Sequence, residues 1–251
     1  MSQSQEYDNV PAQSINLSAT WNINQYEVTY KSADGSNRTS TVSYNYNTSL
    51  PNKIFTRTGY TFVKWVYDSN SQDITNNTLP ANDITVKAIW EINKYNVTFM
   101  PNGANGNPNN VTLNLTYDTD LPVATATNIN FTRSGYRFVR WVNIANNSNI
   151  NTVPGNNVTV KAIWIEQYTV TFKAGTRSGN TISLRLDYGS DLPNYNDSRI
   201  NYVAGSQTFI GWFNTSNNQY STVPRSNITL IADWEGGSTR IFGPVFRNLL
   251  N

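Results

Sequence analysis

The residue types that most often carry chemistry are scarce in this sequence. It contains no cysteine and no histidine, so it has no thiolate nucleophile, no Ser-His-Asp set and no zinc ligands of those two types. A Walker loop and a Gly-x-Gly-x-x-Gly turn after a strand are also absent. Two pairs of carboxylates remain, Asp118 with Asp120 and Asp187 with Asp191, each in front of a Leu-Pro pair.

These aspartates could bind Ca²⁺, but an EF-hand loop supplies more oxygen ligands in series. A glycosidase also needs two carboxylates, yet a pair that recurs along the chain argues against one unique catalytic site. Solvated turn residues are the favoured interpretation. The sequence therefore predicts a protein that is not an enzyme, with no catalytic residue, no metal site and no cofactor.

Charge and hydropathy exclude further classes of protein. The 18 basic residues nearly balance the 16 acidic ones, whereas a nucleic-acid binder would carry a basic patch or stripe. No apolar run approaches the roughly 20 residues of a membrane span. We therefore expect no nucleic-acid partner and no membrane insertion. The first residues lack the basic region and apolar core of a secretory signal, and no LPxTG sorting motif occurs.

The dominant feature of the chain is a repeat. Thr56–Trp65 reads TRTGYTFVKW, Thr132–Trp141 reads TRSGYRFVRW, and Gly205–Trp212 is a shortened third copy. A period of this kind indicates tandem structural units. We predict a mainly β fold of small units arranged as a rod, with a partial repeat at 1–22, complete repeats at 23–92, 93–165 and 166–235, and a C-terminal docking tail at 236–251.

Alternating apolar residues predict the strands of each unit. Each repeat opens with Tyr-x-Val-Thr-aromatic, continues through a second alternating strand that ends in Tyr-x-x-x-Leu-Pro, and closes with a strand such as Ile84–Trp90. In the Gly-Tyr-x-Phe-x-x-Trp strand, Phe and Trp are three residues apart, which breaks strict alternation and suggests either two covered faces or a β-bulge. The connection after Leu-Pro has room for one helical turn.

All seven tryptophans fall at two positions of the repeat, the Phe-x-x-Trp strand and the closing strand. Core anchors are the favoured interpretation, since large aromatic residues supply much of the buried area of a small unit; a stacking platform for sugars or bases is the alternative. We expect the closing tryptophans Trp90, Trp164 and Trp234 to be largely buried. Residues 10–21 copy only a closing strand, so Ile15, Leu17 and Trp21 are predicted to pack on an adjacent repeat or a neighbouring protein.

The four motifs, in this order and three times over, resemble the Listeria–Bacteroides repeat, also called the internalin B-repeat. The resemblance covers about Val10 to Trp234; Lys64 and Arg140 replace a glycine that is usual before the strand tryptophan, and only Gly211 conforms. It implies a β-grasp-like unit with at most a short helix. It also implies a non-enzymatic role in extracellular or surface-exposed bacterial proteins and in some phage proteins, with no catalytic residues.

Three functions fit these observations. The first is a structural protein of a virion, either a capsid decoration or a fibre, whose partners are other subunits such as a capsid protein. The second is an adhesin stalk on a bacterial cell surface, with a host-surface glycan or protein as partner. The third is a carbohydrate-binding module that uses an exposed loop aromatic such as Tyr220.

The C-terminal tail is the second predicted docking element. After Gly236-Gly237 the repeat pattern stops, and the large apolar residues that follow would not be favoured in a free solvated tail. Four of these residues recur at the spacing of one helical face: Val245, Phe246, Leu249 and Leu250. The tail could fold back on the third repeat, but docking on a partner is favoured. Its candidate docking residues are Ile241, Phe242, Val245, Phe246, Leu249 and Leu250.

Overall fold

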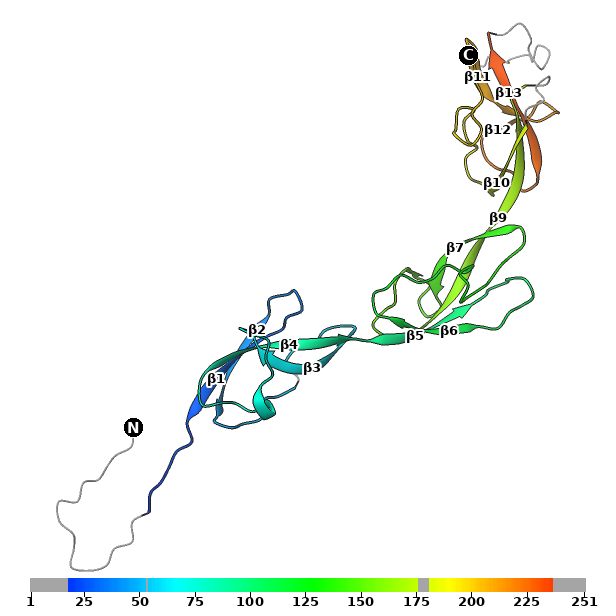
Figure 1. Cartoon of the computed structure of the whole chain (residues 1–251). Helices are drawn as coiled ribbons and strands as arrows, with labels where there is room; N and C mark the ends of the chain where they lie inside the picture. Colours follow the sequence, from blue (N-terminus) through cyan, green and yellow to red (C-terminus); the bar gives the residue numbers. More distant parts are fainter. Residues whose placement is uncertain (1–17, 53, 176–180, 237–251) are drawn as a thin grey trace, which may run out of the picture. The chain divides into compact units, whose positions relative to one another are not determined.

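The fold is nearly all β in the computed structural model, which describes residues 18–52, 54–175 and 181–236. The chain separates into two compact units, 1–93 and 94–251, and each is described by itself. The first holds one repeat and the second holds two (Figure 1). The described residues contain one short 3₁₀ turn, Thr75–Asn77, and no α-helix. The mainly β fold class is confirmed; the arrangement of the units as a rod stays a prediction.

The first repeat is a four-stranded mixed sheet. Its strands are β1 (Gln25–Lys31), β2 (Thr39–Asn45), β3 (Tyr60–Tyr67) and β4 (Ile84–Ile92), in the order β2-β1-β4-β3. The outer pairs are antiparallel and the central pair, β1 with β4, is parallel. A parallel pair needs a long crossover connection, and the whole β2–β3 segment supplies it. This central parallel pair is the arrangement expected of a β-grasp-like unit.

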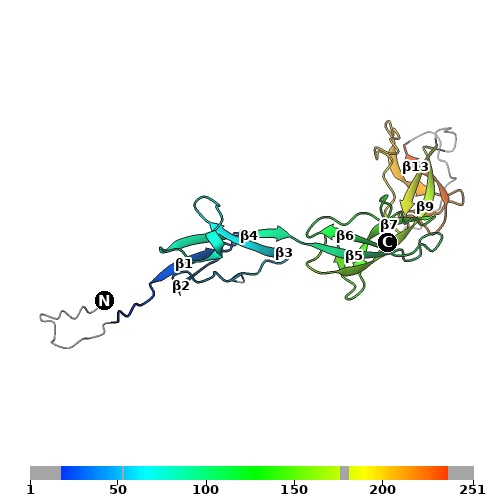
Figure 2. The ribbon, with the colours of Figure 1, turned by 60° about the horizontal axis from the view of Figure 1, so that its bottom comes forward.

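The second unit repeats this sheet twice around one long strand. The middle repeat uses β5 (Lys94–Met100), β6 (Val111–Thr116), β7 (Tyr136–Asn143) and β8 (Asn149–Ile150), and the last repeat uses β10 (Thr181–Asp187), β11 (Thr208–Phe213), β12 (Gln219–Tyr220) and β13 (Ile228–Glu235). Strand β9 (Val158–Lys173) closes the middle repeat with its first half and opens the last repeat with its second half (Figure 1; β9 is also labelled in Figure 2). The boundary predicted between the second and third repeats, at residues 165 and 166, therefore lies inside a strand.

A β-bulge accounts for the three-residue spacing of Phe and Trp in the third strand of all three repeats. The register shifts between Phe62 and Lys64, between Phe138 and Arg140, and between Phe209 and Gly211. One extra residue per strand lets both aromatic residues face the core, and the ring centroids of Phe62 and Trp65 lie 4.9 Å apart. The bulge forms with Lys64 and Arg140 as well as with Gly211, so glycine at this position is not required for it.

Each repeat has its own hydrophobic core. The inward-facing residues of the first and closing strands form one side of this core, and the tryptophan of the Phe-x-x-Trp motif lies at the centre of the core. Trp65, Trp141 and Trp212 are only 2–3 % exposed. The closing tryptophans are less deeply buried and pack at the margin of the core. This agrees with the expectation that most of each closing tryptophan is buried, but the tryptophan of the bulged strand is the more deeply buried one and provides the central anchor.

Candidate functional site

The buried tryptophans explain the Leu-Pro motif. The indole Nε1 of Trp65 donates a hydrogen bond of 2.8 Å to the carbonyl of Pro51. Trp141 donates to Pro122 at 2.7 Å, and Trp212 donates to Pro193 at 2.8 Å. A buried indole N–H needs an acceptor. The second strand of each repeat ends six residues before the proline, not at Leu-Pro as expected from the sequence, so the proline carbonyl lies in a connection and accepts the indole N–H. The motif is thus structural and marks no chemistry of its own.

The closing tryptophans use a second acceptor that is also common to the three repeats. Trp90, Trp164 and Trp234 donate from Nε1 to the carbonyls of Ser32, Pro101 and Ala174, at 2.7, 3.0 and 2.7 Å. Each acceptor directly follows the first strand of its own repeat. Each ring also contacts the phenylalanine of the bulged strand, with centroid distances of 5.4–5.8 Å. A closing tryptophan therefore joins the first and third strands of a repeat.

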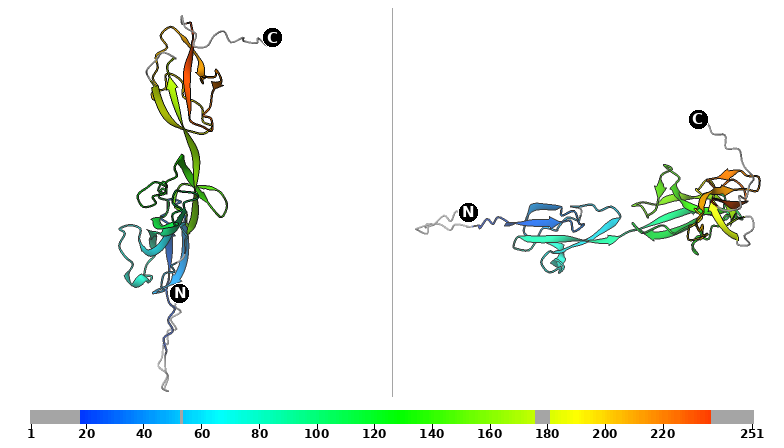
Figure 3. Two further views of the ribbon diagram at one scale, coloured as in Figure 1. Left: turned by 90° about the vertical axis from the view of Figure 1, so that its right-hand side faces the viewer. Right: turned by 90° about the horizontal axis from the view of Figure 1, so that it is seen from above.

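Trp21 is the exception among the seven tryptophans. It is 86 % exposed, and Ile23 beside it is 64 % exposed. Residues 18–24 lead into β1 without running alongside another strand (Figures 1 and 3). Trp21 is thus accessible in this chain, as a docking residue must be, and its docking stays a prediction. Ile15 and Leu17 lie outside the described residues, as do the six apolar residues of the tail from Ile241 to Leu250.

The Thr-Arg-x-Gly-Tyr motif forms a turn at the base of the bulged strand. The guanidinium of Arg57 lies 3.6 Å from the ring centroid of Tyr60, and that of Arg133 lies 3.8 Å from the ring of Tyr136. Such cation–π pairs contribute modestly at exposed sites. The glycine between them is left-handed, with φ of +83° at Gly135, a conformation that glycine adopts without strain. This motif too is explained by local structure.

The carboxylates considered for Ca²⁺ have structural explanations. Asp118 has φ of +60°, and its equivalents Asn47 and Gly189 are also left-handed; Asn, Asp and Gly tolerate this conformation best. Asp120 and Asp191 lie in short bridges to Thr152 and Thr222. Within the residues that the structure describes, no group of three or more carboxylates is placed to hold a metal ion.

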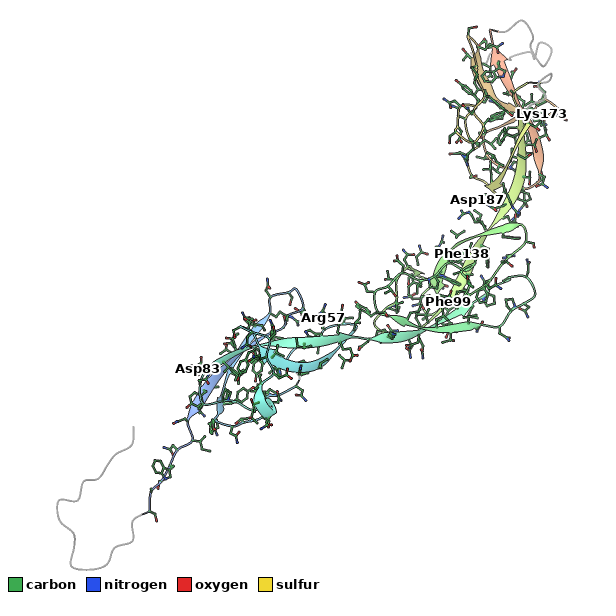
Figure 4. All side chains as sticks on the ribbon, viewed as in Figure 1. Arg57, Asp83, Phe99, Phe138, Lys173 and Asp187 are labelled. Carbon is green, nitrogen blue, oxygen red and sulfur yellow. The ribbon has the colours of Figure 1, made fainter. Side chains whose placement is uncertain are left out.

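Asp187 belongs to a charged cluster where β9 passes from the middle to the last repeat (Figure 4). It accepts hydrogen bonds from Arg137 on β7, with Nε 3.0 Å from Oδ1, and from Gln167 on β9 at 2.9 Å. Arg137 lowers the pKa of this carboxyl. The pair therefore connects the third strand of one repeat to the second strand of the next.

Glu166 is the centre of a second cluster at the same joint. Its carboxylate accepts from Arg225 at 2.9 Å, from the Tyr168 hydroxyl at 3.0 Å and from the Tyr136 hydroxyl at 3.1 Å. Arg225, with smaller contributions from the two hydroxyls, lowers the pKa of Glu166. Arg225 also lies 5.1 Å from the ring centroid of Tyr188. Residues from both repeats thus share a contact at the surface of the joint, in addition to β9.

Sequence reasoning missed this joint. The residues in question lie in different motifs, and only the sheet pairing brings them together. A signal was present nevertheless. Arg137 of the middle repeat replaces Thr61 of the first, and Asp187 of the last repeat replaces Thr116 of the middle one. Charged residues of opposite sign that appear together only on the two sides of this joint were evidence for a specific contact.

A polar hollow of about 490 Å³ lies on the first repeat, next to Asp83 (labelled in Figure 4). Its charged groups are already paired within the protein. The Lys31 ammonium lies 2.6 Å from Asp68, and Asp83 accepts the backbone N–H of Glu27 at 2.7 Å. Asn157 and Asn227 make the same backbone bond in the other repeats, so Asp83 has a structural role and the hollow carries no assignment.

The proposed sugar-binding aromatic, Tyr220, is not on an exposed loop. It lies in β12, pairs with Trp212 and packs half-buried against the core of the last repeat. The premise of an exposed platform at this residue was therefore wrong. None of the described segments forms a helix with the length and hydrophobicity to cross a bilayer.

Comparisons with known proteins identify bacterial relatives. A protein named as a Gly-rich membrane protein in Evansella cellulosilytica is 28 % identical over 206 residues, which cover 71 % of this chain and 22 % of that protein. A protein named as a membrane protein in the same organism is 34 % identical over 95 residues, covering 36 % of this chain and 14 % of its own. The chain thus spans about a fifth or less of the relatives it matches.

The family model of the Listeria-Bacteroides repeat domain matches residues 26–89, 95–163 and 168–233. These three segments coincide with the three sheets and their cores. Repeats of this type are found in surface proteins. The chain belongs to the Listeria-Bacteroides repeat family.

Proposed function

We propose that this chain is a non-enzymatic spacer of an extracellular surface, which holds other parts of a larger protein or assembly at a distance. The observation that supports this most directly is β9, a single strand that serves two repeats. A shared strand with charged clusters on both sides replaces a flexible linker, and a spacer needs such a joint to transmit position. Repeat arrays in general depend on contacts between neighbours.

The finer hypothesis from the sequence is a virion surface, with the chain as capsid decoration or fibre. The relatives named as membrane proteins favour a bacterial cell envelope instead, and we place the spacer there. On a virion and on a cell envelope alike, the repeats would hold other parts apart or carry mechanical load, and they would catalyse no reaction.

Surface labelling tests the location. Antibodies raised against residues 25–235 should label intact, unpermeabilised cells of the source organism, and external protease should remove the signal while a cytoplasmic protein stays intact. Labelling of purified virions without labelling of cells would restore the virion hypothesis. Signal only after permeabilisation would refute a surface role altogether.

Forced unfolding tests the spacer role separately. Pulled from its ends, the chain should give one unfolding step per repeat, each with a length gain of about 3.3–3.6 Å per released residue. Because β9 is shared, we expect the middle and last repeats to unfold in close succession. A single featureless extension at low force would contradict a load-bearing role.

A further inference from the structure

Trp21 has no packing partner among the described residues, whereas its counterpart in each complete repeat has a defined one. Residues 15–21 carry Ile15, Leu17, Ala19 and Trp21 at the spacing of Ile84, Val86, Ala88 and Trp90. The alanine of this set is buried in all three repeats, at Ala88, Ala162 and Ala232. Ala19, in contrast, is exposed, as is every described residue from Ser18 to Asn24.

The last residue of this segment is held in the same way as its counterpart in β9. Asn24 accepts a hydrogen bond of 2.8 Å from the N–H of Tyr46, at the start of the first repeat. Glu166 accepts the equivalent bond, also 2.8 Å, from Tyr188 at the middle of β9. Residues 18–31 therefore enter the first repeat as β9 enters the last one. What residues 18–24 lack is the sheet on the other side.

The three complete repeats show which structure a closing strand packs against. A closing tryptophan needs a backbone carbonyl directly after a Tyr-x-Val-Thr strand and a phenylalanine from a bulged strand. Residues 1–17 are too few to provide those strands, as the span 95–163 of one repeat shows. A second copy of this chain does not fit either, because Trp90, Trp164 and Trp234 fill its three positions.

We propose that Ser18–Trp21 is the end of a closing strand donated to a further repeat of this family outside the printed sequence. The strand would lie between the first and third strands of that repeat and bury Trp21 and Ala19. The partner surface is thus an open repeat with a groove for one tryptophan, and the joint would continue into β1 as β9 continues into the last repeat. This inference concerns the partner and does not depend on which surface carries the chain.

The test adds an open repeat to the full chain. Residues 94–152, which lack their closing strand, are placed directly before Val10, the counterpart of Val153, and hydrogen exchange is measured at residues 18–24. We expect exchange at least tenfold slower than in the unaltered chain, and Trp21→Ala in the fusion should reverse this protection. The same substitution in the unaltered chain should leave its melting unchanged, because the exposed indole packs on nothing there.

A matched fusion carries residues 94–165, with their own closing strand, before Met1. If that added repeat folds while residues 18–24 of the first fusion still exchange at the unaltered rate, the proposal is wrong.

A second variant tests the strand without any added repeat. Thr85→Asn, Val86→Leu, Lys87→Ser and Ile89→Thr convert the closing strand of the first repeat, ITVKAIW, into INLSATW, the sequence of residues 15–21. We expect the first repeat to stay folded, with β1 amides still protected. Loss of that protection, to the level seen when the same seven residues are scrambled, would overturn the proposal whatever the fusions show.

Discussion

Tyr30 offers a sharp test of the core described above, because its hydroxyl is buried without a partner. Its side chain is fully inaccessible, and its hydroxyl is the single buried side-chain polar atom in the described part of the chain with no partner at hydrogen-bond distance. Burial, and secondarily the neighbouring Tyr44 hydroxyl, raise the pKa of Tyr30, but no hydrogen bond of normal length joins the two hydroxyls. The other two repeats have phenylalanine here, Phe99 and Phe172. The ring distances to the central tryptophan are almost equal, 4.8 Å for Tyr30 and Phe99 and 4.7 Å for Phe172.

Tyr30→Phe should therefore stabilise the first repeat. The substitution keeps every ring contact and removes a hydroxyl whose burial without a partner costs about 1–3 kcal/mol. Part of this gain is lost because a small void remains, so we expect a net stabilisation of about 1 kcal/mol. In a unit of this size that corresponds to a rise in melting temperature of roughly 4–8 °C.

The reciprocal substitution supplies the control. Phe99→Tyr introduces the same unpaired hydroxyl into the middle repeat and should destabilise it by about 1–3 kcal/mol. Hydrogen exchange at β1 and β2 reports the first repeat, and exchange at β5 and β6 reports the middle repeat, so the two effects separate within one chain. If Tyr30→Phe destabilises the first repeat by more than about 1 kcal/mol, the hydroxyl has a favourable partner and the reasoning fails.

Four further outcomes are expected. Trp141→Ala should cost about 3–5 kcal/mol and Trp164→Ala less, because Trp141 is 3 % exposed and Trp164 is less deeply buried; equal losses in chemical unfolding would contradict this order. A double-mutant cycle of Arg137→Ala and Asp187→Ala should give a coupling of roughly 0.5 kcal/mol that weakens in high salt, and a coupling of zero would show that β9 alone holds the joint. Since the folded pKa of Asp187 is lowered, its contribution should be present above its unfolded value of about 4 and be lost as pH falls through the lower folded value, so Asp187→Asn should flatten the acid limb of the stability curve. Gly135→Ala, at φ of +83° with open space around the added methyl, should cost about 1 kcal/mol from backbone strain alone, and Gly135→Asn should cost measurably less in the same thermal scan.

Much of the fold follows from local sequence. Alternation in the Tyr-x-Val-Thr and closing strands fixes which residues face the core, because side chains of a strand alternate between its faces. The three-residue step from Phe62 to Trp65 indicated the bulge that the structure contains. The recurrence of four motifs in one order identified the repeat and, through it, the family. The same alternation predicts that residues 10–21 are a closing strand without its sheet, and this stays a prediction.

Tertiary structure decided which tryptophan anchors the core and how neighbouring repeats are joined. The two tryptophan positions have the same residue type and similar neighbours in sequence, and only the bulge places one of them over the middle of the sheet. The charged joint of Glu166, Asp187, Arg137 and Arg225 contains direct contacts between residues up to 59 positions apart. Its contacts depend on a parallel pairing of β9 with β13 and an antiparallel pairing of β9 with β7 and β10. Sequence periodicity specifies which face of a strand a residue occupies, whereas the partner across a joint depends on strand order and register, which long-range pairing alone determines.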